Sequence, residues 1–440
     1  MVVSRDKNPT AQETFMQMAQ AAGLRGRLLV TVGLLILVRF GIFISVPGIN
    51  RDAFAQEIQN NPALGFLDFF SGGGFSALGI FALGILPFIN ASIIIQLLTA
   101  AIPALEDLQK NEGEAGRRKI SQITRYVALG WGILQSTALT LGLLNNERIA
   151  LQPGFAFVAE TVIALTAGSM FVMWISELIT ERGIGNGASL IIFVNIVAVL
   201  PSTLGNTIVF AQSGGREVVL KVALLLLVFL LMIVGIVFVQ EGSRRIPIIS
   251  ARRQINKKLY RGERKSYLPL RLNQGGVMPI IFASAVLILP SFLLEFPAVQ
   301  NIALLQGVLQ SIQPGAGWGY IVFYLTLILG FSYFYASLIV NPVDMSQNLK
   351  KMGSSIPGIR PGKATSDYLE GVINRLTFLG AIFLGVVATV PTLVESATQV
   401  TTLQGLGATS LLILVGVAID TSKQIQTYVI SQRYEGMVKQ

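Results

Sequence analysis

Long apolar stretches alternate with short polar ones along almost the whole chain. A helix needs about 20 mostly apolar residues to cross a bilayer core of roughly 30 Å. A search for such stretches gives ten, of which the last is shorter than the rest, at residues 28–46, 77–101, 123–144, 155–178, 188–209, 218–240, 277–296, 318–340, 372–391 and 408–421. The pattern therefore predicts an all-α membrane protein with ten transmembrane helices.

The loops between these stretches differ in charge. Alternate loops carry 26 of the 33 Lys and Arg residues on one side and 3 on the other, and the remaining four lie in or beside the spans. Cytoplasmic loops of membrane proteins are enriched in Lys and Arg, so we expect the basic loops and both termini to be cytoplasmic. The start of the chain shows no cleavable signal-peptide pattern, because its first apolar stretch is long and contains Arg39.

Ten spans divide into two sets of five, which we assign to an N-terminal half at residues 1–217 and a C-terminal half at residues 218–440. An odd number of spans in each half makes the two halves opposite in topology, as in the inverted repeats of many transport proteins. No clear sequence repeat accompanies this division, so the inverted arrangement is a geometric inference.

Composition narrows the possible chemistry. Hydrophobic residues make up 52% of the chain and charged residues 13%, and the chain contains no cysteine and no histidine. Disulfides, zinc and iron–sulfur sites, and catalysis by imidazole or thiol are therefore excluded. No GxxxxGK[ST] phosphate-binding motif occurs, and no pair of carboxylates lies in mid-span. A membrane enzyme is thus disfavoured. An ion-coupled secondary transporter of a small solute remains an alternative, because carbonyl and hydroxyl oxygens alone can bind sodium.

Two features near the first and second spans each have two interpretations. Residues 66–76 are a short apolar segment that contains the triple glycine Gly72–Gly74, which cannot continue a stable helix. This segment is either a re-entrant piece that lines or blocks a path, or an extracellular loop with interfacial aromatic residues. Arg39, inside the first span, either faces an aqueous cavity, or snorkels or binds backbone carbonyls of a neighbouring helix.

Two cytoplasmic loops are long and basic. Residues 241–272 carry ten Lys and Arg residues, and their segments IPIISA and YLPL predict strands or a hairpin in a folded projection. Residues 341–371 contain the tight turn PGIRPG, which presents Arg360. Such loops are either solvated chains beside anionic lipid or surfaces for an acidic partner or RNA.

Five sequence blocks carry a resemblance to a known family. They are FSGGGFSALGIFALGILPFINASIIIQLL, EGEAGRRKISQITRY, ITERGIGNGASLIIF, LPLRLNQGGVMPIIFAS and NPVDMSQNLKKMGSSIPGIRPG, in this order. Over essentially its whole length the chain resembles the SecY family, the large subunit of the Sec protein-conducting channel, in a bacterial or plastid-type form. The resemblance implies two inverted five-helix halves around a central hourglass pore, with translocation of unfolded secretory polypeptides and release of transmembrane segments into lipid.

The resemblance also implies roles for individual residues. The apolar ring at the waist of the pore matches Ile85, Ile89, Ala188, Ile192, Ile281 and Ile413, and Ala188 departs from the bulky residue usual there. The plug, which closes the outer funnel, corresponds to residues 66–76 and includes Phe66, Leu67, Phe69, Phe70, Ser71, Gly72, Gly73 and Gly74. Candidates for the lateral gate toward lipid are Asn90, Gln135, Asn273 and Leu289.

The two basic loops correspond to the docking surface for partners in the resembled family. Docking candidates are Arg252, Arg253, Lys257, Lys258, Arg261 and Arg360. The implied partners are SecE-like and SecG-like small subunits, the SecA motor ATPase, the ribosome, the translocating polypeptide and membrane lipid. No cofactor or metal is implied, and the expected location is the bacterial plasma membrane or also the thylakoid membrane.

Overall fold

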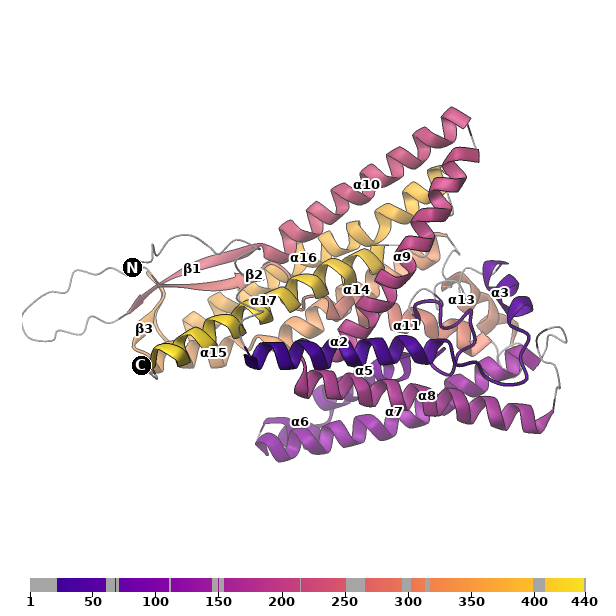
Figure 1. Ribbon diagram of the computed structural model, residues 1–440. Helices are drawn as coiled ribbons and strands as arrows, with labels where there is room; N and C mark the ends of the chain where they lie inside the picture. The colour runs from indigo at the N-terminus through magenta and orange to yellow at the C-terminus, as the bar shows by residue number, and fades with distance from the viewer. Residues whose placement is uncertain are drawn as a thin grey trace, which may run out of the picture. The chain divides into compact units, whose positions relative to one another are not determined.

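The computed structural model describes residues 22–60, 68, 71–110, 112–144, 149, 154–213, 215–250, 266–294, 302–312, 317–398 and 408–438 (Figure 1). An α-helix occupies most of each of the ten predicted spans. These helices are α2 (Ala22–Ile42), α5 (Leu86–Ala101), α7 (Gly113–Leu144), α8 (Phe155–Arg182), α9 (Gly187–Ser213), α10 (Gly215–Glu241), α11 (Met278–Leu294), α14 (Trp318–Ile339), α16 (Lys363–Thr398) and α17 (Ala408–Val438). Shorter helices are α3 (Arg51–Asn60), α6 (Pro103–Lys110), α13 (Ala303–Ile312) and α15 (Pro342–Lys351).

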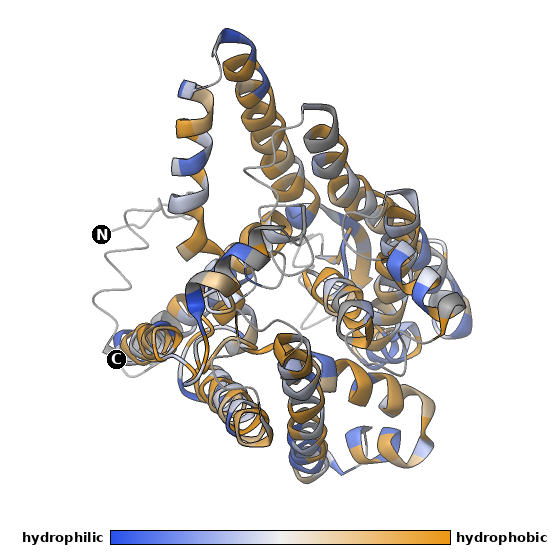
Figure 2. Cartoon of the chain, turned by 90° about the vertical axis from the view of Figure 1, so that its right-hand side faces the viewer, coloured by the Kyte–Doolittle hydropathy of each residue, from blue (hydrophilic) through white to orange (hydrophobic). Residues whose placement is uncertain are grey.

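Most of the helices are hydrophobic along most of their length (Figure 2). Within the described residues, six helices are long and apolar enough to cross a membrane, and a seventh span results if the bent pair α5 and α6 is counted as one. The bend between α5 and α6 is 105°. The protein is therefore an integral membrane protein with a helical fold.

The chain divides into two compact units. The first comprises Met1–Asn206, Ala285–Ala316 and Val417–Gln440, and the second comprises Thr207–Ser284 and Gly317–Gly416. In the first unit α7 packs against both α5 and α8, and in the second α16 packs against α10 and α14. The predicted division into halves at residues 217 and 218 stays a prediction.

The second predicted span differs from expectation at its beginning. We predicted one continuous helix over residues 77–101, but residues 72–85 form turns and α5 starts only at Leu86. Gly84 has a φ of +51°, and Leu78, which is fully buried, has a φ of +39°, so the helix cannot start earlier. Ser169 of α8 donates a hydrogen bond to the Gly84 carbonyl (3.1 Å) and so supplies a partner that lipid could not.

A small antiparallel sheet lies in the second unit (Figure 1). Strands β1 (Ser243–Ser250) and β2 (Ser266–Arg271) form the predicted hairpin, and β3 (Ser354–Ser355) pairs with the other edge of β1, in the order β2-β1-β3. Since β1 and β2 belong to the first basic loop and β3 to the second, the sheet joins the two loops. Ile246 of β1 and Leu270 of β2 are buried in a cluster with Leu349, Ile356 and Leu369.

Candidate functional site

The described part of the plug segment (residues 66–76) is held together by local hydrogen bonds. The Asp68 carboxylate accepts the Ser76 backbone N–H at 2.6 Å, and the Asp68 carbonyl accepts the Ser71 hydroxyl at 2.9 Å. The Ser71 hydroxyl oxygen in turn accepts the Phe75 N–H at 2.7 Å. Burial raises the pKa of the Asp68 carboxyl, although the hydrogen bonds that it accepts act in the opposite direction. Four predicted plug residues lie outside the described residues: Phe66, Leu67, Phe69 and Phe70.

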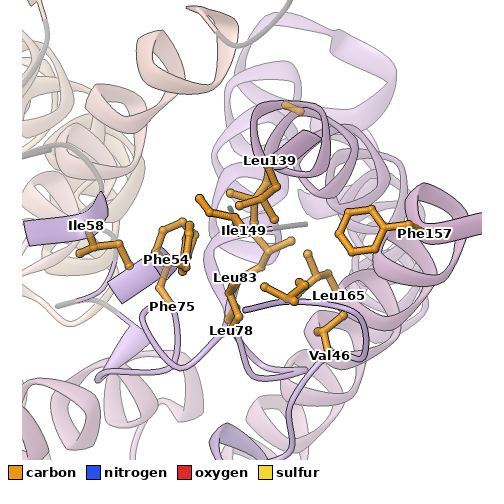
Figure 3. Packing of buried hydrophobic residues seen from close by; sticks show 14 of the residues in the cluster. Val46, Phe54, Ile58, Phe75, Leu78, Leu83, Leu139, Ile149, Phe157 and Leu165 are labelled. Carbon is orange, nitrogen blue, oxygen red and sulfur yellow. The ribbon is translucent and has the colours of Figure 1, made fainter. Parts of the chain in front are cut away.

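Aromatic packing of Phe75 holds the end of the plug segment in the core of the first unit (Figure 3). The rings of Phe75 and Phe54 of α3 lie 5.4 Å apart, and both side chains belong to one buried cluster with Val46, Leu78 and Leu165. The backbone continues this attachment. The N–H of Val46 donates to the carbonyl of Leu78 at 3.0 Å, and the N–H of Ile80 donates to the carbonyl of Ile44 at 2.8 Å. The chain just after α2 thus holds the chain just after the plug segment.

Arg39, near the end of α2, contacts the triple glycine Gly72–Gly74 of the plug segment, which we call the glycine joint. Its Nη1 donates a hydrogen bond to the carbonyl oxygen of Gly72 at 2.9 Å. Gly72 is buried and has a φ of +70°. Of the two interpretations of Arg39, the structure shows carbonyl binding, and the carbonyl belongs to the plug segment rather than to a neighbouring helix.

The other side of Gly72 contacts α9. A side-chain carbon at Gly72 would lie 2.9 Å from Cα and Cβ of Asn195 and 2.5 Å from Arg39 Nη1, so only glycine fits. Ile192, a predicted ring residue, precedes Asn195 by three positions and is 1% exposed. Three residues advance a helix by about 4.5 Å. The glycine joint therefore lies about one helical turn from Ile192 along α9.

The predicted ring residues fall in both units. In the first unit, Ile85 and Ile89 are buried on consecutive turns at the start of α5, and Ala188 is half-buried at the start of α9. In the second unit, Ile281 and Ile413 are both buried, at 3% and 0% exposure. Apolar residues are thus buried at all these positions apart from Ala188, and the ring itself stays a prediction.

The lateral-gate candidates are buried or half-buried. Asn90 of α5 and Gln135 of α7 are 4% and 1% exposed, on two helices that pack together. Within the described part of the chain, neither polar atom of the Gln135 side chain has a hydrogen-bond partner. Asn273 donates to the Gly276 carbonyl at 2.7 Å, and Leu289 lies half-buried in α11. Their role in a gate stays a prediction.

Arg360 lies on a turn that is held by two side-chain-to-backbone hydrogen bonds. Its carbonyl accepts the Thr365 hydroxyl at 2.9 Å, and the carbonyl of Gly362 accepts the Ser346 hydroxyl at 2.7 Å. The Arg360 side chain is exposed, and no described carboxylate forms a salt bridge with it. Exposed basic residues of strands β1 and β2 and of the second basic loop are Arg244, Arg245, Arg271, Lys350, Lys351, Arg360 and Lys363. The other docking candidates lie outside the described residues: Arg252, Arg253, Lys257, Lys258 and Arg261.

Sequence reasoning missed three residues that hold the plug segment. Asp68 is the one charged residue of the segment, and its position three residues before Ser71 is typical of a capped turn. Asn195 is a polar residue at i+3 from Ile192, so the two share a helix face. Phe54 is 2% exposed, but the sequence did not reveal its contact with Phe75, because the two residues are 21 positions apart. Among the described residues, no group of three His, Cys, Asp or Glu could hold a metal ion.

Comparison with known proteins identifies relatives over the whole chain. Residues 79–422 match the model of the SecY family. The chain is 73% identical to the protein translocase subunit SecY of Synechocystis sp., with 100% of both chains covered.

Two solved structures share the fold. One is the structure of a protein conducting channel (TM-score 0.65, 15% identity, 97% of this chain and 95% of that chain). The other is Sec61 in the canine ribosome-channel complex from the endoplasmic reticulum (TM-score 0.61, 14% identity, 97% and 95%).

Proposed function

The chain belongs to the SecY family, and from this premise we propose that it is the pore-forming subunit of a protein translocase. It conducts unfolded polypeptides through a central hourglass pore between two inverted halves and releases transmembrane segments through a lateral gate. The observation that carries this proposal is the 73% identity to a translocase subunit across both complete chains. The channel performs no catalysis of its own and takes its energy from partners.

The plug segment supports a gated channel rather than an ion-coupled transporter. Non-helical backbone at membrane depth is stable only where protein or a water-filled cavity surrounds it. Here Phe75 and Ser71 are 1% and 3% exposed, so protein surrounds this backbone: the Phe75 ring packs on Phe54, and the Ser71 hydroxyl accepts the Phe75 N–H. A pore closed by an apolar ring and a removable plug excludes water and ions while no polypeptide is present.

The joined basic loops support docking of a partner on the cytoplasmic side. Seven exposed cations belong to strands β1 and β2 or to the second basic loop, and β3 pairs that loop, which carries the turn of Arg360, with the hairpin. Such a surface suits the phosphates of ribosomal RNA and acidic patches of a motor such as SecA. The similarity in fold to a channel bound to a ribosome is consistent with this assignment. SecE-like and SecG-like subunits complete the complex.

The membrane is that of a bacterial cell, the plasma membrane and also the thylakoid membrane, with both termini in the cytoplasm. The division of Lys and Arg residues between the loops supports this orientation. The 73% identity to the relative from Synechocystis sp., a cyanobacterium, supports a photosynthetic host with both membranes.

Reconstitution tests the proposed function. Vesicles that contain this chain, a small clamp subunit and a motor should protect a secretory polypeptide from added protease when ATP is supplied. Vesicles that lack this chain are the control. Absence of protection would refute the channel, whereas gradient-driven uptake of a small solute by this chain alone would establish the transporter alternative.

Replacing Ile89 by Gly should increase the resting ion leak several-fold, because it removes a buried side chain from the predicted ring. Single-channel or vesicle-efflux conductance measures the effect. Leu97→Gly is the matched control, since it places the same helix-weakening residue, at a cost of about 1 kcal/mol, at an exposed position of α5. An equal leak in both variants would contradict a role in the ring.

Replacing Ile249 by Pro should weaken partner docking by about threefold to tenfold while the helices stay folded. Ile249 pairs with Ser355 of β3 and not with β2, so proline there breaks the pairing between the two loops and spares the hairpin. Affinity for the ribosome or the motor measures the effect. Ile249→Thr keeps the β-preference and is the control, and normal binding by the proline variant would show that the loops dock independently.

A further inference from the structure

Arg39 occupies an unusual place for a charged residue. It lines an apolar groove of about 400 Å³ between α2 and α9, whose other lining residues are Val32, Leu35, Ile36, Phe40, Phe43 and Val194. These side chains offer no hydrogen-bond acceptor. The charge is therefore compensated by the carbonyl of Gly72, which is the hydrogen-bond partner that the structure places on Nη1.

The accepting carbonyl belongs to a joint and not to a regular element. Gly72 begins the triple glycine, and it has a positive φ that favours glycine. Its carbonyl oxygen accepts the hydrogen bond from Arg39 of α2. No other residue type fits there, because a Cβ would meet both Arg39 and Asn195. A charged donor makes a hydrogen bond roughly twice as strong as a neutral one, and more so where water is scarce.

We propose that Arg39 is a positioning residue that latches the plug segment in its seated position. The bond between its guanidinium and the Gly72 carbonyl exists while the joint lies against α9. When the plug segment leaves, the guanidinium loses its partner in an apolar groove, and this cost favours reseating. Water that enters a fully opened path solvates the guanidinium and removes this cost. The latch therefore favours reseating only until the path has filled with water. The inference rests on the proposed plug role of residues 66–76.

The absence of cysteine from the chain makes a direct test possible. Ser76→Cys introduces a single thiol of similar size at a half-buried position of the plug segment. A membrane-impermeant maleimide, added from the extracytoplasmic side to the complete channel complex in vesicles, reports how often this position is unseated. The measurement needs no motor, ribosome or substrate, so it tests the latch even where translocation fails.

In this background, Arg39→Met should raise the labelling rate about tenfold, which corresponds to about 1.4 kcal/mol. Arg39→Lys keeps a charged donor and should return the rate to within about threefold of the parent. Arg27→Met is the matched control, since Arg27 lies at the other end of α2 and stacks on Tyr428 instead of reaching the plug segment. It should leave the rate unchanged.

Two results would overturn the latch. One is an unchanged labelling rate in Arg39→Met. The other is an equal increase in Arg39→Met and Arg39→Lys, which would show that the shape of the side chain and not its charge holds the segment.

Discussion

Deleting residues 66–76 is expected to raise the ion conductance of the resting channel by about tenfold or more, because the pore then loses its outer barrier. The deletion removes Phe75 from the buried cluster and abolishes the contacts of Gly72 with Arg39 and Asn195. What remains is the apolar waist, which slows ions by dewetting alone. Electrical recording of the reconstituted complex without substrate measures the effect.

A smaller change should act in the same direction. Phe75→Ala leaves the chain length intact but removes a ring that is 1% exposed and packs on Phe54, at a cost of about 3–5 kcal/mol. Ile163→Ala is the control, because Ile163 is 67% exposed on α8. If the deletion leaves the conductance at its resting value, the segment is an ordinary extracellular loop, as the alternative interpretation of the sequence proposes.

Replacing Arg360 by Glu is expected to reduce partner-driven translocation about 30-fold while the folded protein stays in the membrane. Buried arginine contacts in interfaces are often worth about 2 kcal/mol, which corresponds to a factor of about 30. The side chain is exposed in the free channel and its turn is fixed by the hydrogen bonds of Thr365 and Ser346, so the change alters the docking surface and leaves its support intact. Protease protection of a secretory substrate measures the effect.

Charge reversal close by separates a specific contact from general attraction. Lys363→Glu makes the same change in net charge three residues away, at another exposed position. It should reduce translocation only a few-fold, mostly through slower association and more so at low salt. Equal losses in the two variants would show that Arg360 acts as one charge among many, and normal translocation by Arg360→Glu would remove it from the docking surface.

The sequence predicted the helical framework because each span has to satisfy its backbone within itself in lipid, and this need is visible as local apolar length. The hairpin in the first basic loop was also visible, since β-branched residues stand between turn residues. The beginning of the second span was predicted wrongly. Its residues 77–85 are apolar enough for a helix, but Leu78 and Gly84 adopt backbone angles that a helix excludes, and Ser169 on another helix stabilises them.

The contacts of Arg39 show the limit of sequence reasoning most clearly. The sequence by itself placed a charge inside an apolar span and a flexible joint 33 positions later. It also predicted ten spans, and it showed the charge asymmetry of the loops and the absence of cysteine and histidine. Tertiary structure alone decided that the charge and the joint meet at 2.9 Å, that Asn195 faces the joint, and that β3 joins the two basic loops. The physical reason is range: hydrophobicity and backbone preference act on neighbours along the chain, whereas a hydrogen bond between distant residues depends on how the helices between them pack.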